Sequence, residues 1–184
     1  MSMAQNEIDI YVLDANRIDA LAEHIARHRQ ESGRDGDIHF MPFLPDDPDG
    51  PKAPELALLE RGLDQTGWQR WWVAEHRASG RVIGHIDVRG APIKAIAHRC
   101  ELGLGIERPY RGRALGEALM REVINFCRAA PGLVWLDLKV FAHNHAAIRL
   151  YERLGFHAYG KVVDIIRLEG ESIDDVQMTL NVQT

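Results

Sequence analysis

Three arginines and two glycines lie close together where the apolar pattern of a strand gives way to that of a helix. The arginines are Arg108, Arg111 and Arg113, and the glycines are Gly112 and Gly116. The first turn of a helix presents N–H groups without intrahelical partners and the positive end of the helix dipole, so it favours anions. Arginine side chains add charge-assisted donors. The stretch therefore predicts an anion site, although a solvated basic turn before an ordinary helix would have the same composition.

Two familiar nucleotide-binding signatures do not describe this stretch. No Gly-Lys-Ser/Thr follows the glycines, so it is not a P-loop. Gly103-x-Gly105 lies inside the expected strand rather than after it, so it is not a dinucleotide-binding turn.

Residues 106–116 resemble motif A of the GNAT superfamily of acyl-CoA-dependent N-acetyltransferases, Arg/Gln-x-x-Gly-x-Gly/Ala after a strand. Ala114 departs from the usual glycine, and its methyl group would crowd a close approach of pyrophosphate to the backbone. The resemblance implies that the pantetheine arm of acetyl-CoA contacts one set of residues: Leu104, Gly105 and Ile106. It implies that the pyrophosphate contacts another set: Arg111, Gly112, Arg113, Ala114, Leu115 and Gly116.

Residues 144–156 resemble motif B of the same superfamily, Asn-x-x-Ala-x-x-Leu-Tyr-x-x-x-Gly-Phe, at each of those positions. Two motifs in the right order are more specific than either alone, and the resemblance is clear over about residues 70–181. It implies that Asn144 contacts the coenzyme arm, a role compatible with capping the following helix.

The resemblance also implies direct attack of a primary amine on the thioester. Tyr151 would protonate the departing sulfur, with a core aromatic as the alternative. Glu101 is the candidate base, as in the phosphinothricin-type branch. A structural carboxylate, with water taking the proton, is the alternative. Lys139 stands where the ribosomal-protein alanine branch has a glutamate, so that version of the base is absent.

Other polar residues have less specific patterns. His24 and His28 share a helical face, but no third metal ligand is evident, so we expect an exposed surface and no metal. His85 and Asp87 share one face of a strand and would line an acceptor pocket or be simple surface residues. His143 and His145 flank Asn144. We expect Trp68, Trp71 and Trp72 to pack in the core or at an interface. The acidic, aromatic segment at 35–55 would either face a cationic acceptor or be solvated.

The elements that must position these residues follow from periodicity and turn signals. We expect helices near 16–30, 56–67, 115–129 and 146–154, and a long loop at 31–54. The expected strands are 8–13, 71–75, 82–88, 100–106, 134–140, 162–168 and 175–180. This order predicts an α/β fold with a mixed, mostly antiparallel sheet of about six or seven strands and helices on both faces. The resemblance adds that strands 100–106 and 134–140 form a splayed parallel pair.

Length and composition limit the function. The chain has 184 residues and a formal net charge of −5, which predicts a single domain over 1–184 and argues against a general nucleic-acid binder. The first 16 residues lack the pattern of a signal peptide, and no apolar run is long enough to span a membrane. Cys100 and Cys127 are too few for a disulfide scaffold, so we expect a cytoplasmic protein.

The resulting expectation is an N-acetyltransferase that uses acetyl-CoA and acts on a small-molecule or peptide amine. A non-catalytic acyl-CoA sensor with the same fold and a protein-docking role for the arginine-rich turn are the alternatives. The closing residues resemble a hairpin that supports dimers in many family members, so we also expect a homodimer.

Overall fold

The computed structural model describes residues 7–184. Residues 1–6 lie outside the described residues, so the expectations of a single domain over 1–184 and of no signal peptide fall partly outside them. The strands are β1 (Ile8–Val12), β2 (Gln69–His76), β3 (Arg81–Gly90), β4 (Arg99–Ile106), β5 (Trp135–Phe141), β6 (His157–Leu168) and β7 (Glu171–Asn181). The helices are α1 (Ile18–Arg29), α2 (Leu56–Glu60), α3 (Leu115–Ala129) and α4 (His145–Arg153), with short 3-10 turns at Ala15–Arg17, Lys94–Ile96 and Arg108–Tyr110.

The seven strands form one sheet in the order β1-β2-β3-β4-β5-β7-β6. Only β4 and β5 pair in parallel, whereas all other neighbours are antiparallel. The expected mixed sheet is therefore confirmed. β6 begins at residue 157 rather than at 162, because its pairing with β7 continues to His157, opposite Thr179.

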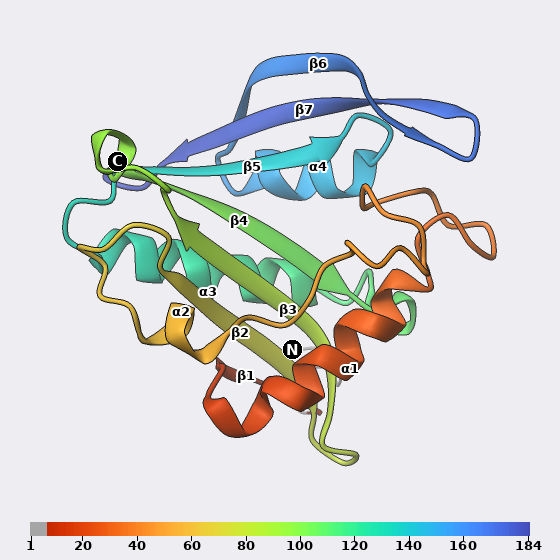
Figure 1. Ribbon diagram of the computed structural model, residues 1–184, viewed down its shortest axis with the longest axis horizontal. Coiled ribbons are helices and arrows are strands. Elements are labelled where there is room, and N and C mark those ends of the chain that lie inside the picture. The colour runs from red at the N-terminus through yellow and green to blue at the C-terminus, as the bar shows by residue number, and fades with distance from the viewer. Residues whose placement is uncertain (1–6) are drawn as a thin grey trace.

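Helices cover both faces of the sheet, as expected (Figure 1). α3 packs on β2, β3 and β4, and α1 packs on the opposite face of β3 and β4. The core beneath α3 includes Leu119, Met120 and Val123, which alternate with exposed residues at helical spacing. The expected core role of the three tryptophans is confirmed, because Trp68, Trp71 and Trp72 are all buried.

The expected helix over residues 56–67 is wrong in length, because α2 ends at Glu60. Arg61 leaves the helical conformation, and the Arg70 side chain donates to the carbonyls of Leu59 and Arg61. These side-chain donors satisfy carbonyls at the end of the helix, and Gly62 follows directly after its C-cap residue, Arg61.

The acidic loop, which we define as residues 31–55, contains turns and bends but no helix or strand, as expected. It leaves the end of α1 and returns to α2 (Figure 1). Ser32 is fully buried, and its hydroxyl accepts a hydrogen bond from the Phe40 N–H, which closes the loop on itself. The loop is thereby held beside the end of β4, where the site lies.

Within the described residues, no helix is long and apolar enough to cross a membrane. Cys100 and Cys127 are free and buried, and their sulfur atoms lie 3.7 Å apart between β4 and α3.

Candidate active site

β4 and β5 separate soon after they begin to pair. Their parallel register runs from Arg99 opposite Trp135 to Glu101 opposite Asp137, and β4 continues to Ile106 while β5 continues to Phe141. Figure 1 shows the two strands diverging in a V. Backbone groups on the facing edges of the V are free to pair with an extended ligand, as an added strand would.

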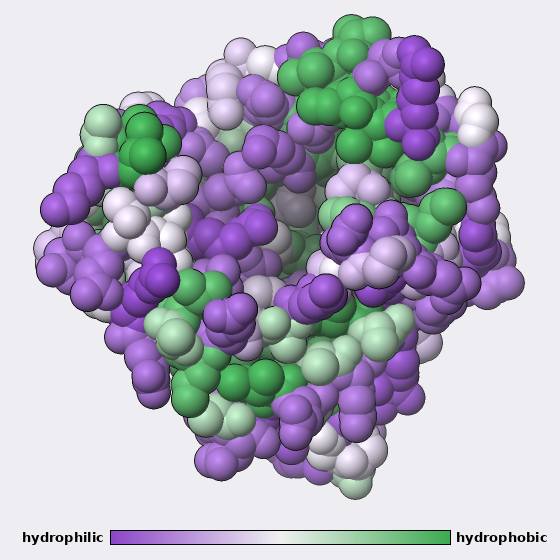
Figure 2. Space-filling model, in the orientation of Figure 1, coloured by the Kyte–Doolittle hydropathy of each residue, from purple (hydrophilic) through white to green (hydrophobic). Residues whose placement is uncertain are grey.

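A cavity of about 830 Å³ fills this V and extends to the acidic loop. Figure 2 shows the molecule hollowed near the middle of the corresponding face. The cavity wall includes most of the residues expected to bind the coenzyme or react: Glu101, Leu104, Ile106, Arg111, Gly112, Ala114, Gly116, Asn144 and Tyr151. Gly105, Arg113 and Leu115 are absent from this wall, and Leu115 is instead buried in the core beneath α3.

The glycine-containing turn lies at one end of the cavity, immediately before α3. Gly112 and Ala114 both have positive φ angles, of 72° and 61°. A Cβ atom added at Gly116 would lie 3.1 Å from the side chain of Leu150 and 3.3 Å from that of Ile106, so glycine lets α3 start close to β4 and α4. The first N–H groups of α3 thus lie at the cavity wall, where they can meet an anion.

Ala114 holds a left-handed backbone conformation that costs a residue with a Cβ about 1–2 kcal/mol. We expect Ala114→Gly to raise the free energy of unfolding by about 0.5–1 kcal/mol, because glycine removes this strain but loses more entropy on folding. Chemical denaturation of both proteins measures the change. Ala118→Gly, in the regular part of α3, is the control and should destabilise the protein. A lower stability for Ala114→Gly would contradict the strain at this position.

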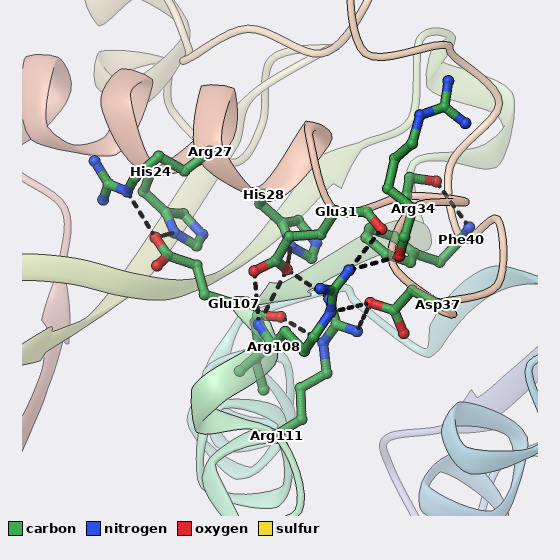
Figure 3. Close-up of polar contacts among 12 residues, drawn as sticks. His24, Arg27, His28, Glu31, Arg34, Asp37, Phe40, Glu107, Arg108 and Arg111 are labelled. Atoms are coloured by element: carbon green, nitrogen blue, oxygen red, sulfur yellow. Dashed lines mark hydrogen bonds and ion pairs between the residues drawn. The ribbon is translucent and has the colours of Figure 1, made fainter.

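Arg111 is paired with acidic groups rather than left free for a ligand. Its guanidinium donates to Asp37 at 2.6 Å, to Glu31 at 2.7 Å and to the Ile106 carbonyl at 2.8 Å, and it lies over the Phe40 ring. We expected the arginines and the acidic segment to serve two different ligands. Here they meet each other and fasten the acidic loop to the turn (Figure 3).

Arg108 completes the same network. Its side chain donates to Asp37 and Asp35 and to the carbonyls of Glu31 and Arg34, while its backbone N–H donates to the Glu31 carboxylate. Arg108 therefore braces the acidic loop.

Asn144 and Tyr151 lie at the two ends of α4. The Asn144 side chain accepts a hydrogen bond from the Ala147 N–H at 3.2 Å, so its capping role is confirmed. Tyr151 is buried, and burial raises its pKa to about 12. Its hydroxyl makes no hydrogen bond within residues 7–184, and burial alone accounts for the raised pKa. The phenol therefore keeps its proton at neutral pH and faces the cavity with that proton available.

Glu101 lies in the cavity wall, as expected, but it is paired. Its carboxylate is 2.9 Å from Lys139 Nζ and 3.5 Å from Arg89 Nη2, and 39% of its side chain is exposed. Lys139, identified in the sequence only as a missing carboxylate, is thus the partner of the candidate base. The Glu101 carboxylate is thus held between two cationic side chains.

Asp87 and His85 share a face of β3, as expected, but neither is part of the cavity wall. Asp87 is buried against Gly103, and burial raises its pKa to about 6, with Arg89 opposing the rise. His85 Nδ1 lies 2.9 Å from His24 Nε2. Burial, together with the nearby His24 and His28, lowers the pKa of His85 well below its usual value.

The expectation that His24 and His28 lie on an exposed surface is wrong, because both are buried against the sheet. They continue the apolar face of α1 that includes Leu21 and Ile25, so their i, i+3, i+4 spacing already contained the signal. Their rings stack 5.8 Å apart. No group of histidine, cysteine and acidic residues within residues 7–184 is arranged to hold a metal ion.

Glu107 lies next to the site and was not identified from the sequence. It is buried directly after β4 and accepts hydrogen bonds from His24 Nδ1 at 2.9 Å, Arg27 Nε at 3.0 Å and Arg81 Nη2. Burial alone would raise the pKa of Glu107, but His24 and Arg27 outweigh it and lower that pKa to about 2. The carboxylate fixes α1 to the strand that forms the site.

His143 and His145, on either side of Asn144, differ in their contacts. His143 Nε2 lies 2.6 Å from the His39 carbonyl, which joins the acidic loop to the start of α4, whereas His145 is exposed. Neither histidine is part of the cavity wall.

Comparison with known proteins agrees with this geometry. The Acetyltransferase (GNAT) family matches residues 37–156, more than half of the chain, and the chain belongs to that family. The L-amino acid N-acetyltransferase AaaT of Escherichia coli (strain K12) is 32% identical over 101 residues, which are 54% of this chain and 61% of that protein. The chain thus spans less than two thirds of that relative's length.

Solved structures show the same fold. A GNAT-family acetyltransferase from Streptococcus pneumoniae has a TM-score of 0.81 at 23% identity, with 95% of this chain and 99% of that chain covered. The structure of yncA, a putative acetyltransferase from Salmonella typhimurium described with its cofactor acetyl-CoA, has a TM-score of 0.74 at 17% identity and covers 96% of this chain and 95% of that one.

Proposed function

We propose that the protein transfers an acetyl group from acetyl-CoA to a primary amine. The observation that carries the proposal is the cavity between the diverging strands β4 and β5, which joins the turn before α3 to Tyr151 and Glu101. A ligand with an anionic end, an extended arm and a reactive end matches this arrangement, in which the turn, the open strand edges and the reactive side chains follow one another along the cavity. The acetyl-CoA described with the Salmonella typhimurium structure supports the same assignment.

In this proposal, the turn at 111–116 receives the pyrophosphate and the open edge of β4 at 104–106 pairs with the pantetheine arm. Gly112 leaves the turn without a side chain, Gly116 lets α3 begin close to Ile106 and Leu150, and Asn144 orders the start of α4 next to the arm. Because Arg111 is held by Glu31 and Asp37, the backbone N–H groups supply much of the anion site and Arg111 supplies charge beside it.

The reaction needs a proton donor for sulfur and a proton acceptor for nitrogen. Tyr151 is the proposed donor, because its buried hydroxyl faces the cavity and remains protonated. Glu101, expected from the resemblance to be the base, is proposed to attract and orient the acceptor's ammonium group. Its ion pairs with Lys139 and Arg89 hold the carboxylate in place at the acceptor end of the cavity.

The acceptor end of the cavity contains charges of both signs. Arg89 and Lys139 are cationic, Glu101 and Asp175 are acidic, and Phe43 adds an apolar wall. This mixture suits a small amine with a carboxylate of its own, or the end of a peptide. The name of the Escherichia coli relative, an L-amino acid N-acetyltransferase, favours the first class.

A panel of amino acids, their amides, short peptides, polyamines and aminoglycosides, incubated with acetyl-CoA, tests the proposal. We expect release of free coenzyme A thiol to rise with at least one amine above the rate without amine. The non-catalytic sensor predicts acetyl-CoA binding with no amine-dependent release. The protein-docking alternative predicts no heat on titration with any acyl-CoA.

We further propose a homodimer and a cytoplasmic location. β6 is an edge strand with three exposed apolar side chains, Tyr159, Val163 and Ile165, and Figure 2 shows apolar residues gathered near the top of the view, where β6 lies. The two free thiols are compatible with a reducing compartment. A monomer mass in sedimentation equilibrium would contradict the dimer, and fractionation into an oxidising compartment would contradict the location.

A further inference from the structure

His28 is the histidine of α1 that reaches the cavity. It lies in the cavity wall together with Gly103, Leu104 and Phe40, whereas His24 and His85 lie behind it. Its ring stacks on Phe40 with the centroids 4.7 Å apart, which fixes the plane of the imidazole. An imidazole held in this way at a cavity wall has the position that proton transfer requires.

The absence of a side chain at Gly105 brings His28 against β4. A Cβ atom added at Gly105 would lie 2.8 Å from His28 Cδ2 and 3.0 Å from His28 Nε2. Gly105 belongs to the part of β4 that has already separated from β5, since the parallel register ends at Glu101. The imidazole edge with Nε2 therefore lies over β4 at Gly105, between Leu104 and Ile106, which both line the cavity, although Gly105 itself does not.

Glu31 sets the tautomer of His28. Its Oε2 atom lies 3.3 Å from His28 Nδ1, and an ionised carboxylate can only accept a hydrogen bond. Glu31 is held ionised: burial raises its pKa, but hydrogen bonds from His28 and the Arg108 N–H and the charge of Arg111 outweigh burial and lower it. In neutral His28 the proton therefore belongs to Nδ1, and Nε2 has the lone pair.

No partner within residues 7–184 uses that lone pair. Nδ1 pairs with Glu31, and Nε2 has no hydrogen bond in the described part of the chain. Two other titratable groups face the ring, His24 from α1 and His85 from β3. Burial lowers the pKa of both of these histidines, and the two ring nitrogens of His24 are already paired with Glu107 and His85, so the hydrogen-bond partner of His28 Nδ1 is Glu31.

We propose that His28 is the general base that takes the proton from the acceptor amine, and that Glu31 is its positioning residue. The assignment rests on the proposed acetyl transfer and adds a residue to it. The acceptor reacts as the neutral amine, after its ammonium form has released one proton to water. As the nitrogen–carbonyl bond forms and the carbon–sulfur bond breaks, one proton passes from nitrogen to His28 Nε2 and one from the Tyr151 hydroxyl to sulfur. Exchange with water then returns both residues to their starting forms.

The test is the pH dependence of kcat/KM for His28→Asn, using acetyl-CoA and the best amine of the panel. Asparagine retains a donor toward Glu31 but has no basic nitrogen. We expect kcat/KM to fall by about 10²–10³ and the acid limb of the wild-type profile to disappear. The dissociation constant of acetyl-CoA should change less than about threefold. His76→Asn, at the far end of β2 and hydrogen-bonded to Ser79, is the matched control and should behave as wild type.

A second variant separates a base from a packing residue. In His28→Ala, added imidazole should restore part of the lost rate, because the vacated space opens into the cavity and accepts a free base. Alanine also has a high helix propensity, so α1 should still form.

The alternatives give different results. Wild-type activity with an unchanged rate and pH profile in His28→Asn would overturn this assignment and leave acetyl transfer standing. Loss of the acid limb in Asp87→Asn or Glu101→Gln, with the limb retained in His28→Asn, would also overturn it and assign the base to that carboxylate. If the wild type transfers acetyl to no amine, the proposed function and this assignment fail together.

Discussion

Replacing Tyr151 with phenylalanine should lower kcat by about 10²–10⁴, the usual contribution of a general acid. The ring and its contact with Phe156, with the centroids 5.9 Å apart, remain, so only the hydroxyl is lost. Since Tyr151 has no hydrogen-bond partner within residues 7–184, its removal leaves no buried polar group of the described chain unpaired. We therefore expect the stability and the dissociation constant of acetyl-CoA to change little.

Steady-state kinetics and calorimetric titration of acetyl-CoA together measure this prediction. Because the pKa of Tyr151 is raised to about 12, its acid form persists through the accessible alkaline range, and the wild type should show no alkaline limb from this residue. Tyr11→Phe is the control: its hydroxyl donates to Glu75, far along the sheet from the cavity. Equal kcat values for wild type and Tyr151→Phe would remove Tyr151 from the reaction.

Replacing Glu107 with glutamine should destabilise the fold by about 3 kcal/mol at neutral pH. A pKa lowered from 4.5 to about 2 corresponds to that free energy, at about 1.36 kcal/mol per pKa unit. Because the folded pKa lies below the unfolded one, this stability is complete above about pH 4.5 and is lost as the pH falls toward 2. The variant should therefore lose less stability than wild type across that range.

Urea denaturation at pH 7 and at several pH values below 5 measures the effect of Glu107→Gln. Glu117→Gln is the matched control, because Glu117 forms a more exposed pair with Arg121 on the surface of α3 and should change stability by less than about 0.5 kcal/mol. Similar small effects for both variants would show that the buried network of Glu107 contributes little to stability.

Much of the fold was predictable because its elements have clear periodicity. α3 was expected at 115–129 and is found there, since its apolar residues recur at helical spacing and a Pro-Gly pair follows it. β6 and α2 were less well predicted. The first half of β6 depends on pairing with β7, a tertiary effect that local sequence does not contain. The end of α2 has tertiary support from the side chain of Arg70, but Gly62 just after it was also a local stop signal.

The positions of the motif residues in the cavity wall were easier to predict than those of the residues that α1 and the acidic loop contribute. Motif residues such as Arg111 and Tyr151 are close in sequence to the elements they serve, whereas His28 reaches the cavity because α1 packs across β4, and Glu31 contacts His28 from behind the cavity wall. The pairing of Arg111 with Asp37 joins segments 74 residues apart. Net charge and composition could not indicate that these opposite charges meet each other before they meet a ligand.

The most direct measurement of the central claim is the identity and amount of the product. Purified protein is incubated with acetyl-CoA and the best amine of the panel, and the mixture is analysed by mass spectrometry and for free thiol. Acetyl transfer predicts an N-acetylated amine formed in equal amount to free coenzyme A, with almost none of either in Tyr151→Phe. Free coenzyme A accompanied only by acetate, or formed at the same rate with and without amine, would contradict it.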